Sequence, residues 1–200
     1  GLLTIATDRE KSRTAYFILT DYVRKGSPRS RKRLFIVHRL DRETTGVLLF
    51  AKTVEAKLNL QDQWKRGEVD KKYLAVVHGR VATPSGTIST YLAENKAHLV
   101  YSTTDAAVGR IAHTAYRVLR QTKAYSLLEV NLLTGRKHQI RVHLAGIGHP
   151  VAGDAKYGRE PISHARLALH ARSLSLTHPT SGERLTFEAS APAFFARLVG

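Results

Sequence analysis

Residues 38–53 read HRLDRETTGVLLFAKT, and their polar first half lies between two short apolar runs of the chain. One run, VLLFA at 47–51, belongs to the stretch itself, and the other, LFIV at 34–37, directly precedes it. Both have the length and composition of buried strands. The sequence therefore predicts that Asp41 lies on a connection between two core elements, where the backbone is held at both ends and functional side chains are frequent.

The chemistry open to Asp41 depends on its charge state. Arg39 and Arg42 lie close to it on either side in the sequence, and an opposite charge within a few ångströms favours the ionised carboxylate. An ionised Asp is suited to act as a nucleophile and poorly suited to act as a general acid. The alternative is structural, in that Asp41 caps a turn or pairs with a surface arginine.

The composition restricts the class of protein. The chain has 200 residues, 42% of them hydrophobic, and a formal net charge of +16. We expect one folding unit, residues 1–200, whose positive potential attracts anions, with nucleic acid first and acidic membrane second. The apolar runs are far shorter than the ~20 residues that span a bilayer, so we expect a cytoplasmic protein that does not enter a membrane. Methionine is absent even at position 1, so we also expect that N-terminal residues of a longer protein are missing.

The residues that commonly hold metals and cofactors form no convincing site. Cysteine is absent, which excludes disulfides, thiol nucleophiles and thiolate metal ligands. The best metal hypothesis uses His138, His143 and His149, but the first two are separated by about 140° on a helix and cannot share an ion without irregular backbone. There is no P-loop and no GxGxxG element. We therefore expect neither a metal nor a cofactor.

Local patterns predict an α/β (α+β) fold. The clearest helix starts at Thr53, an N-cap residue, and ends at Gly67, with apolar residues at helical spacing between them; we expect one of these, Trp64, in the core. No internal repeat and no strict alternation of strands and helices is present, which favours a mixed, mainly antiparallel sheet with flanking helices. The other expected elements are a strand at 71–81, two strands within 113–135, a short helix over 137–146, strands at 167–179 and 182–192, and a closing helix within 192–200.

The segment RKGSPRSRKR at 24–33 has a composition that cannot bury a core. We expect it to be a mobile basic loop. It is either a solvated connector or a contact with RNA, and its composition does not decide between them.

Two further positions are candidates for chemistry. Arg141 lies on the expected short helix about 100° from the apolar residue Ile140, so it can face a cleft while its neighbour packs. The alternative is an ordinary exposed arginine. Tyr73, in the strand at 71–81, is either a buried aromatic residue or a stacking platform for a nucleobase.

The stretch at 38–53 resembles the catalytic motif of the RluA-type pseudouridine synthases, whose pattern is HRLD, two variable positions, TSG, a short apolar run and AKT. Thr45 stands where that family usually has serine, and the chain begins at GLL, where the family normally has Lys-Pro just before. The resemblance covers nearly all of the chain, because three more family blocks follow in order: KKYLAVVHG at 71–79, LLTGRKHQIRVHLAGIGHPVAGDAKYG at 132–158 and LALHARSLSLTHP at 167–179.

The resemblance implies both a fold and a reaction. The fold is one catalytic domain with a mixed, mainly antiparallel sheet crossed by an active-site cleft. The reaction is the cofactor-independent isomerisation of specific uridines in structured RNA, either ribosomal or transfer RNA. The target nucleotide is flipped out of its stack, the bond from C1′ to N1 breaks, the uracil turns, and the bond re-forms through C5.

The resemblance also implies roles for particular residues. By position, Asp41 is the catalytic aspartate that attacks the uridine, and Arg141 is the arginine that pairs with it. Tyr73 is the tyrosine that stacks on the target base and assists proton removal, while Leu169 or Leu167 supplies the apolar contact on the other side of the base. We also expect substrate contacts from Arg39, Arg42, Arg136, Lys137 and His138.

Two alternatives belong to other classes of protein. One is a catalytically silent RNA-binding or RNA-remodelling module, against which the intact set of candidate catalytic residues argues. The other is a glycosidase-like or nucleosidase-like hydrolase, which ordinarily uses two carboxylates flanking the bond. Glu43 is close to Asp41 in the sequence, but nothing fixes the direction of its side chain. The expected partner is RNA, either ribosomal or transfer RNA, and no obligate protein partner is implied.

Overall fold

The computed structural model describes the chain apart from residues 7–9, 11, 28 and 159–165. Eight strands of the described residues form one sheet, and two more form a short ribbon. The strands of the sheet are β2 (Thr45–Gly46), β4 (Asp70–His78), β5 (Ser85–Glu94), β6 (Val100–Thr103), β7 (Arg110–Gln121), β8 (Tyr125–Leu132), β9 (Leu169–Thr177) and β10 (Arg184–Glu188).

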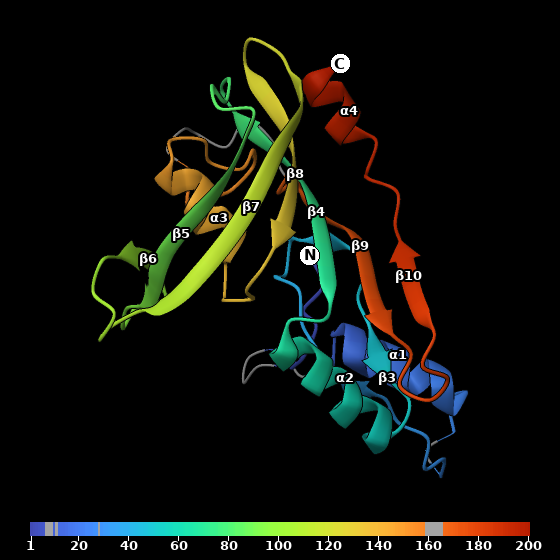
Figure 1. Ribbon diagram of the computed structural model, residues 1–200. Helices are drawn as coiled ribbons and strands as arrows, with labels where there is room; N and C mark the ends of the chain where they lie inside the picture. Colours follow the sequence, from blue (N-terminus) through green and yellow to red (C-terminus); the bar gives the residue numbers. More distant parts are fainter. Residues whose placement is uncertain (7–9, 11, 28, 159–165) are drawn as a thin grey trace.

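The sheet has the order β10-β9-β4-β8-β7-β5-β6, with β2 also paired to β9 (Figure 1). Every pair is antiparallel except that between β2 and β9. The expected mixed, mainly antiparallel sheet is confirmed. The ribbon consists of β1 (Phe35–Ile36) and β3 (Phe50–Ala51).

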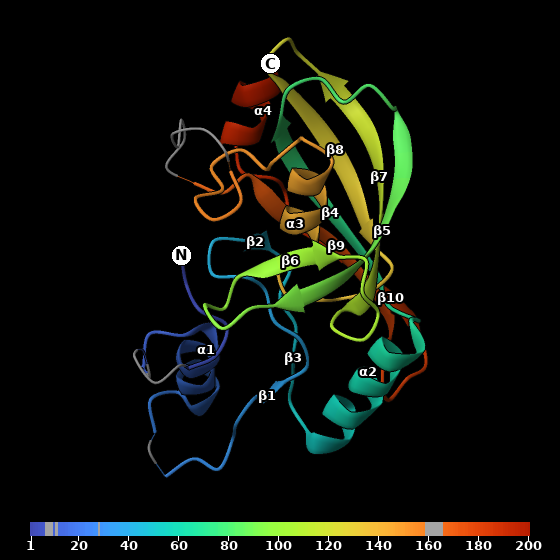
Figure 2. The ribbon, with the colours of Figure 1, turned by 90° about the vertical axis from the view of Figure 1, so that its left-hand side faces the viewer.

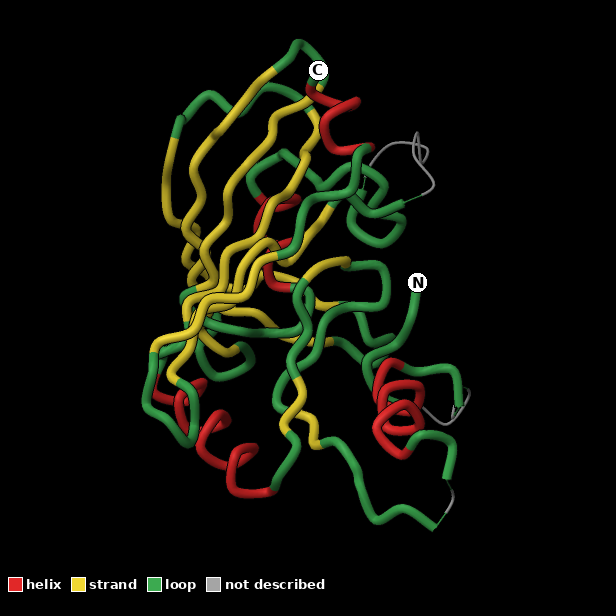
Figure 3. The backbone as a smooth tube through the Cα atoms, turned by 90° about the vertical axis from the view of Figure 1, so that its right-hand side faces the viewer, coloured by secondary structure: helices red, strands yellow, loops and turns green. Residues whose placement is uncertain are grey.

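Four helices are seen in the described part of the chain: α1 (Ala15–Arg24), α2 (Val54–Arg66), α3 (Gln139–Gly146) and α4 (Phe194–Val199). Figure 2 shows α3 in front of the long strands of the sheet, with α1 and α2 below it. From the opposite side, Figure 3 shows α4 at one end of the molecule and α1 and α2 at the other. None of these helices is long and apolar enough to cross a membrane.

Helix α2 follows the local signals of its sequence. The Thr53 hydroxyl accepts a hydrogen bond from the Ala56 N–H at 3.1 Å, and Gly67 ends the helix with φ +73°. Trp64 is half-buried against the apolar cluster beneath the helix, which includes Leu60 and Leu174. The predicted helix is therefore confirmed.

Other predicted elements are confirmed with shifted ends. The apolar runs at 34–37 and 47–51 form only the two-residue strands β1 and β3. The helix predicted over 137–146 starts at Gln139, because His138 has a left-handed backbone with φ +53°. Strands β5 and β6 and helix α1 were not predicted.

The basic segment 24–33 is partly ordered by α1. Arg24 is the last residue of that helix, and its Nε donates to the Lys32 carbonyl at 2.8 Å. The described residues that follow Arg24 form neither helix nor strand up to position 33, as predicted for a loop. Pro28 lies outside the described residues.

Candidate active site

Asp41 lies on the connection between β1 and β3, as predicted, and precedes the short strand β2 within that connection. Its carbonyl accepts a hydrogen bond from the Thr44 N–H at 3.1 Å, which closes a turn. One residue earlier, the N–H and carbonyl of Leu40 both bind the Thr4 hydroxyl at 3.2 Å. The backbone on either side of Asp41 is thus fixed, while its side chain remains 20% exposed.

Arg141 reaches Asp41 from α3 and is itself held by a second carboxylate. Its Nε and Nη2 donate to the two oxygens of Asp154 at 2.8 and 2.7 Å, and its Nη1 lies 3.4 Å from Asp41 Oδ2. The bidentate pair with Asp154 fixes the plane of the guanidinium group. Arg141 is therefore a buried bridge between two carboxylates, and the reading as an exposed helical arginine is wrong.

Asp154 is fully satisfied in its buried position. Beyond Arg141, its Oδ1 accepts the N–H groups of Lys156 and Tyr157 at 2.9 and 3.0 Å. Burial by itself raises the pKa of Asp154, but these hydrogen bonds and the charge of Arg141 outweigh it and lower the pKa. Burial likewise opposes the charge of Arg141, yet Asp154 and then Asp41 raise the pKa of its guanidinium group. Both partners stay ionised.

The two arginines next to Asp41 in the sequence do not act as predicted. Arg42 turns away and binds Glu10 at 2.6 Å and the Gly1 carbonyl at 3.2 Å. Arg39 is exposed and lines both cavities that contain Asp41. The cation that contacts Asp41 comes instead from α3, because folding brings Arg141 across a long separation in sequence.

Tyr73 lies on β4 and faces a cavity of about 450 Å³ that Asp41 also lines. Burial and then the charge of Asp41 raise the pKa of its phenol, which therefore stays neutral at ordinary pH. Leu169, on the neighbouring strand β9, is buried and lines the same cavity. The ring and the leucine provide an apolar enclosure next to the carboxylate.

His138 links the site to Tyr157. Its Nδ1 lies 2.7 Å from the Tyr157 hydroxyl, whose oxygen accepts the Val100 N–H at 3.2 Å. The hydroxyl is then free to donate to Nδ1, which leaves the imidazole proton on Nε2, 3.9 Å from Asp41 Oδ1. Burial chiefly, with the nearby cations Arg141, Lys156 and Lys137, lowers the pKa of His138 despite the charge of Asp41.

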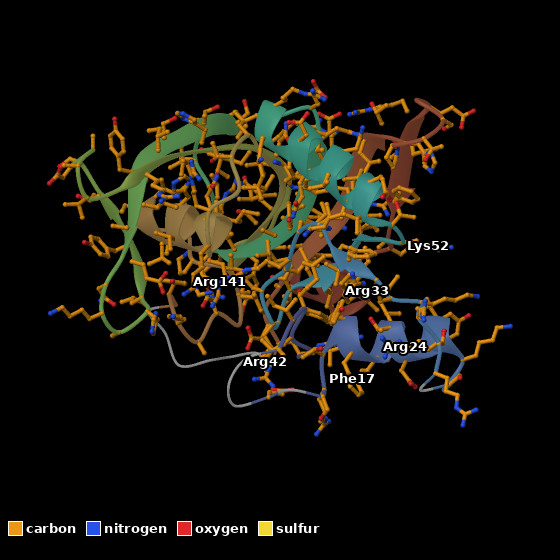
Figure 4. The ribbon with its side chains drawn as sticks, turned by 90° about the horizontal axis from the view of Figure 1, so that it is seen from below. Phe17, Arg24, Arg33, Arg42, Lys52 and Arg141 are labelled. Carbon is orange, nitrogen blue, oxygen red and sulfur yellow. The ribbon has the colours of Figure 1, made fainter. Side chains whose placement is uncertain are left out.

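The remaining predicted contacts divide between two cavities. A second cavity, of about 660 Å³, lies on the other side of Asp41 and includes Arg42 and Leu167. Figure 4 shows Arg141 beside α3 and Arg42 nearer α1. Asp41, Arg39, His138 and Arg141 line both cavities, whereas Tyr73, Leu169, Arg136 and Lys137 line only the first. The side chain of Lys137 is paired with Glu94.

The three histidines of the metal hypothesis have separate hydrogen-bond partners. His143 binds the hydroxyls of Thr90 and Thr114, and burial lowers its pKa to about 4. His149 binds the carbonyl of His78 at 2.9 Å, and His138 binds Tyr157.

Two residues that support the site were not predicted. Asp154 carries no local signal, since its role arises only when its loop meets α3. Gln139 is buried, and its amide donates to the His113 carbonyl and the Thr114 hydroxyl while its oxygen accepts from Thr134 and the Arg136 N–H. It thereby fixes the loop that enters α3. The sequence signal that could have indicated Gln139 is its place in the motif HQIR, which also contains Arg141.

Thr45, at the position where serine is usual in the resembled motif, keeps the hydroxyl function. Its Oγ1 lies 2.7 Å from Nδ1 of His170, whose Nε2 donates to the Ala189 carbonyl at 3.0 Å. The hydroxyl can therefore donate to Nδ1. The substitution leaves this contact between β2 and β9 intact.

Comparison with known proteins identifies the family. A model described as RNA pseudouridylate synthase matches residues 6–146. The chain is 44% identical to ribosomal large subunit pseudouridine synthase D of Nitrosomonas europaea over 175 residues, or 82% of this chain and 50% of that protein. It is 42% identical to an uncharacterized RNA pseudouridine synthase of Bacillus subtilis, covering 82% of this chain and 54% of that one.

Solved structures agree with this assignment. Human RNA pseudouridylate synthase domain containing 4 aligns with a TM-score of 0.78 at 26% identity, covering 98% of this chain and 84% of the human chain. Human RNA pseudouridylate synthase domain containing 1 gives 0.73 at 29% identity, covering 87% and 74%. The chain spans about half the length of the curated relatives it matches. On these grounds it belongs to the RluA-type RNA pseudouridine synthase family.

Proposed function

We propose that this protein isomerises uridine to pseudouridine in RNA and that Asp41 is the nucleophile. The observation that carries the proposal is the position of Asp41 between two cavities, with Arg141 held against it by Asp154. The guanidinium group is fixed before substrate arrives, so the carboxylate is oriented without reorganisation during the reaction.

The first cavity suits an anionic polymer. Its lining includes five basic residues and one acidic residue: Arg39, Lys71, Arg136, Lys137 and Arg141, against Asp41. The apolar surfaces of Tyr73 and Leu169 can enclose a flipped uracil ring. The basic residues attract the phosphates that surround it.

The chemistry needs one nucleophile and one proton transfer. Asp41 attacks C1′ of the target uridine as the C1′–N1 bond breaks. The uracil then turns, and C5 bonds to C1′ as the bond between C1′ and Asp41 breaks. C5 then loses its proton, and N1 ends with a proton in place of its bond to the sugar. Tyr73 is a neutral phenol, so it assists at C5 by passing on its own proton as it accepts one rather than as a phenolate base.

Among the described residues that line the first cavity, where Tyr73 and Leu169 lie, Asp41 is the only carboxylate, and Glu43 lines only the second cavity. Asp154 is the second carboxylate in contact with Arg141, but its side chain is fully buried and its oxygens are occupied by Arg141 and backbone N–H groups. A two-carboxylate mechanism needs a group that can reach the bond or a water molecule.

The test is the Asp41→Asn variant. We expect no pseudouridine from it in a single-turnover assay, while its unfolding free energy and RNA affinity stay near those of the wild type, because the amide preserves shape and cannot attack. Asp62→Asn, which removes an exposed carboxylate on α2, is the matched control and should turn over normally. Retention of more than a few per cent of the wild-type rate by Asp41→Asn would assign the protein to another mechanism or to the silent RNA-binding class.

We infer further that the substrate is ribosomal RNA of the large subunit, in preference to transfer RNA. Support comes from relatives in Nitrosomonas europaea and Pseudomonas aeruginosa, whose names state a large-subunit activity, at 44% and 40% identity. A map of the pseudouridines lost from cellular RNA on deletion of the gene tests this. Loss confined to transfer RNA would overturn the inference.

A further inference from the structure

Lys71 is a buried cation without an anionic partner among the described residues. It lies on β4 with 9% of its surface exposed. Its ammonium group makes no hydrogen bond or ion pair within the described part of the chain. The adjacent carboxylate, Asp70, is bound to Arg184 at 2.5 Å instead. The ammonium nitrogen is not among the fully buried polar atoms without a partner, so it is open to the cavity that Lys71 lines and is available to an anionic ligand.

Lys71 faces the same cavity as the proposed nucleophile. Residues two apart on a strand point to the same face, which puts Lys71 beside Tyr73 on β4, about 7 Å along the strand. The pairing of β4 with β9 shifts between these two residues, but the extra residue belongs to β9, so the alternation of β4 is kept. Both side chains line the cavity of about 450 Å³ that contains Asp41.

Two aromatic side chains, His38 and Trp64, line the same cavity as Lys71. These two rings stack with their centroids 5.0 Å apart, and both line the cavity. Burial, together with the charge of Lys71, lowers the pKa of His38 to about 4. Burial also lowers the pKa of Lys71, and Asp70, rather than Asp41, is the carboxylate that opposes this shift. Lys71 and Asp41 line one cavity, and the ion pairs of Asp41 among the described residues are with Arg141 and His138 instead.

We propose that Lys71 binds a backbone phosphate of a nucleotide next to the target uridine. An ammonium group is a compact charge that suits a phosphate oxygen, and RNA offers one phosphate per nucleotide. If Asp41 meets the target nucleotide, a group about 7 Å farther along β4 than Tyr73 meets its neighbour in the chain. The proposal rests on the proposed function for the identity of the ligand as RNA.

A competing explanation is that the apolar stem of Lys71 covers the cluster beneath α2 while its head reaches solvent. Val69 and Leu174 belong to that cluster, and Leu174 is opposite Lys71 on β9. Lys71→Met separates the two explanations, because it keeps the stem and removes the charge. Lys72→Met is the matched control, since Lys72 is exposed and faces the other side of β4.

The experiment measures the affinity of a short single-stranded oligouridylate by fluorescence anisotropy at several salt concentrations. Loss of a hydrogen bond from a charged group predicts that Lys71→Met binds about tenfold more weakly or worse. The slope of log affinity against log salt should also flatten by about 0.7. Lys72→Met should show neither change. Equal behaviour of the two variants would show that Lys71 serves only through its stem.

A second measurement locates the phosphate, and its main result comes from the wild-type protein alone. Each phosphodiester of the oligouridylate is replaced in turn by an uncharged methylphosphonate. One replacement should weaken binding to the wild type about tenfold and add no further loss to Lys71→Met. Wild-type binding that tolerates every replacement, or no wild-type binding at millimolar oligonucleotide, overturns the proposal. The binding measurement does not require the protein to convert uridine. A failure to form pseudouridine would therefore contradict the proposed function but would not affect the conclusion about Lys71.

Discussion

At Asp154 the chain buries a second carboxylate behind the proposed nucleophile. Asp154→Asn removes this charge and leaves the buried Arg141 with Asp41 alone, at 3.4 Å. Breaking a buried ion pair from one side costs on the order of 3 kcal/mol or more. We expect that loss in the unfolding free energy from urea denaturation, and a fall in turnover larger than the fall in RNA affinity. Turnover equal to wild type would show that Asp41 needs no positioning through Arg141.

The stability that Asp154 provides depends on pH with a definite sign. Although burial raises its pKa, the interactions with Arg141 and two N–H groups bring the pKa below the ordinary value of 3.8. A carboxyl group with a lowered folded pKa stabilises the protein fully above its unfolded pKa, and this is lost as pH falls through the folded value. The difference in unfolding free energy between wild type and Asp154→Asn should be constant from neutral pH to about pH 5 and shrink below about pH 4. A difference that grows on acidification would contradict the assignment.

Tyr73 combines a ring and a hydroxyl that substitution can separate. Tyr73→Phe keeps the apolar surface beside Leu169, so RNA affinity should stay near wild type while turnover falls by about a hundredfold or more, the usual effect of losing an acid or base. Tyr73→Ala should also weaken capture of the flipped base, which fluorescence of a 2-aminopurine placed next to the target reports. Equal base capture by both variants would show that the ring does not stack.

At the scale of elements, the pairing of β2 with β9 fixes the turn that carries Asp41. Gly46 has φ +113°, and a Cβ added there would lie 2.2 Å from the Ala171 carbonyl oxygen. That atom also accepts the Val47 N–H at 3.0 Å, so it cannot move freely. The contact explains why glycine ends the HRLDRETTG segment, since any side chain would force β2 away from β9.

We therefore expect Gly46→Ala to destabilise the protein by about 2 kcal/mol or more and to lower turnover through displacement of Asp41. Gly146→Ala is the matched control: this glycine ends α3, has no atom within 4 Å of an added Cβ, and should be neutral or slightly stabilising. Thermal unfolding measures both. Equal melting temperatures for the two variants would show that β2 can move away from β9 without loss of stability.

The elements that the sequence predicted well are those with local signals. Helix α2 has its N-cap at Thr53 and its left-handed end at Gly67, so neighbouring residues suffice to specify it. Strand β5 lacks such signals, because SGTISTYLAE is largely polar and small and is held by its long pairing with β7. Helix α1 also escaped prediction, since Phe17, Ile18 and Tyr22 on it are exposed rather than buried along one face.

At the scale of the whole molecule, part of the excess positive charge lies away from the candidate active site. Figure 4 shows Arg24, Arg33 and Lys52 on the α1 side, away from Arg141. A separate cavity of about 530 Å³ is lined by Lys25, Lys32, Arg33 and Lys52, together with Tyr22, and none of its described lining residues is acidic. The basic segment 24–33 thus presents cations on a surface distinct from the two cavities at Asp41.

Replacing Arg29, Arg31, Lys32 and Arg33 by Ser should flatten the slope of log RNA affinity against log salt by about one to three units. Turnover at saturating RNA should hardly change, because Asp41 and Tyr73 are untouched. The control replaces Arg80, Arg117, Arg120 and Lys123, which are exposed residues on β7 or in the turns that follow β4 and β7, and tests the effect of net charge alone. Superimposable slopes for both quadruple variants would make the segment a solvated connector.

The candidate site was predictable from sequence only in part. The motifs indicated Asp41, Tyr73 and Arg141, and the structure brings all three to one cavity. The prediction that Arg42 contacts Asp41 was wrong. The two residues are adjacent in the sequence, but the Arg42 side chain binds Glu10 instead. Asp154 was not predicted because its contact with Arg141 depends on the tertiary fold. The contact exists only after the loop that follows α3 has folded back.

Both chain neighbours of Asp41 are hydrogen-bonded to residues 1–4: Leu40 binds the Thr4 hydroxyl, and the Arg42 side chain binds the Gly1 carbonyl. The turn that carries the proposed nucleophile therefore depends on partners outside the HRLD motif. Removing residues 1–4 would leave the N–H and the carbonyl of Leu40 without their hydroxyl partner.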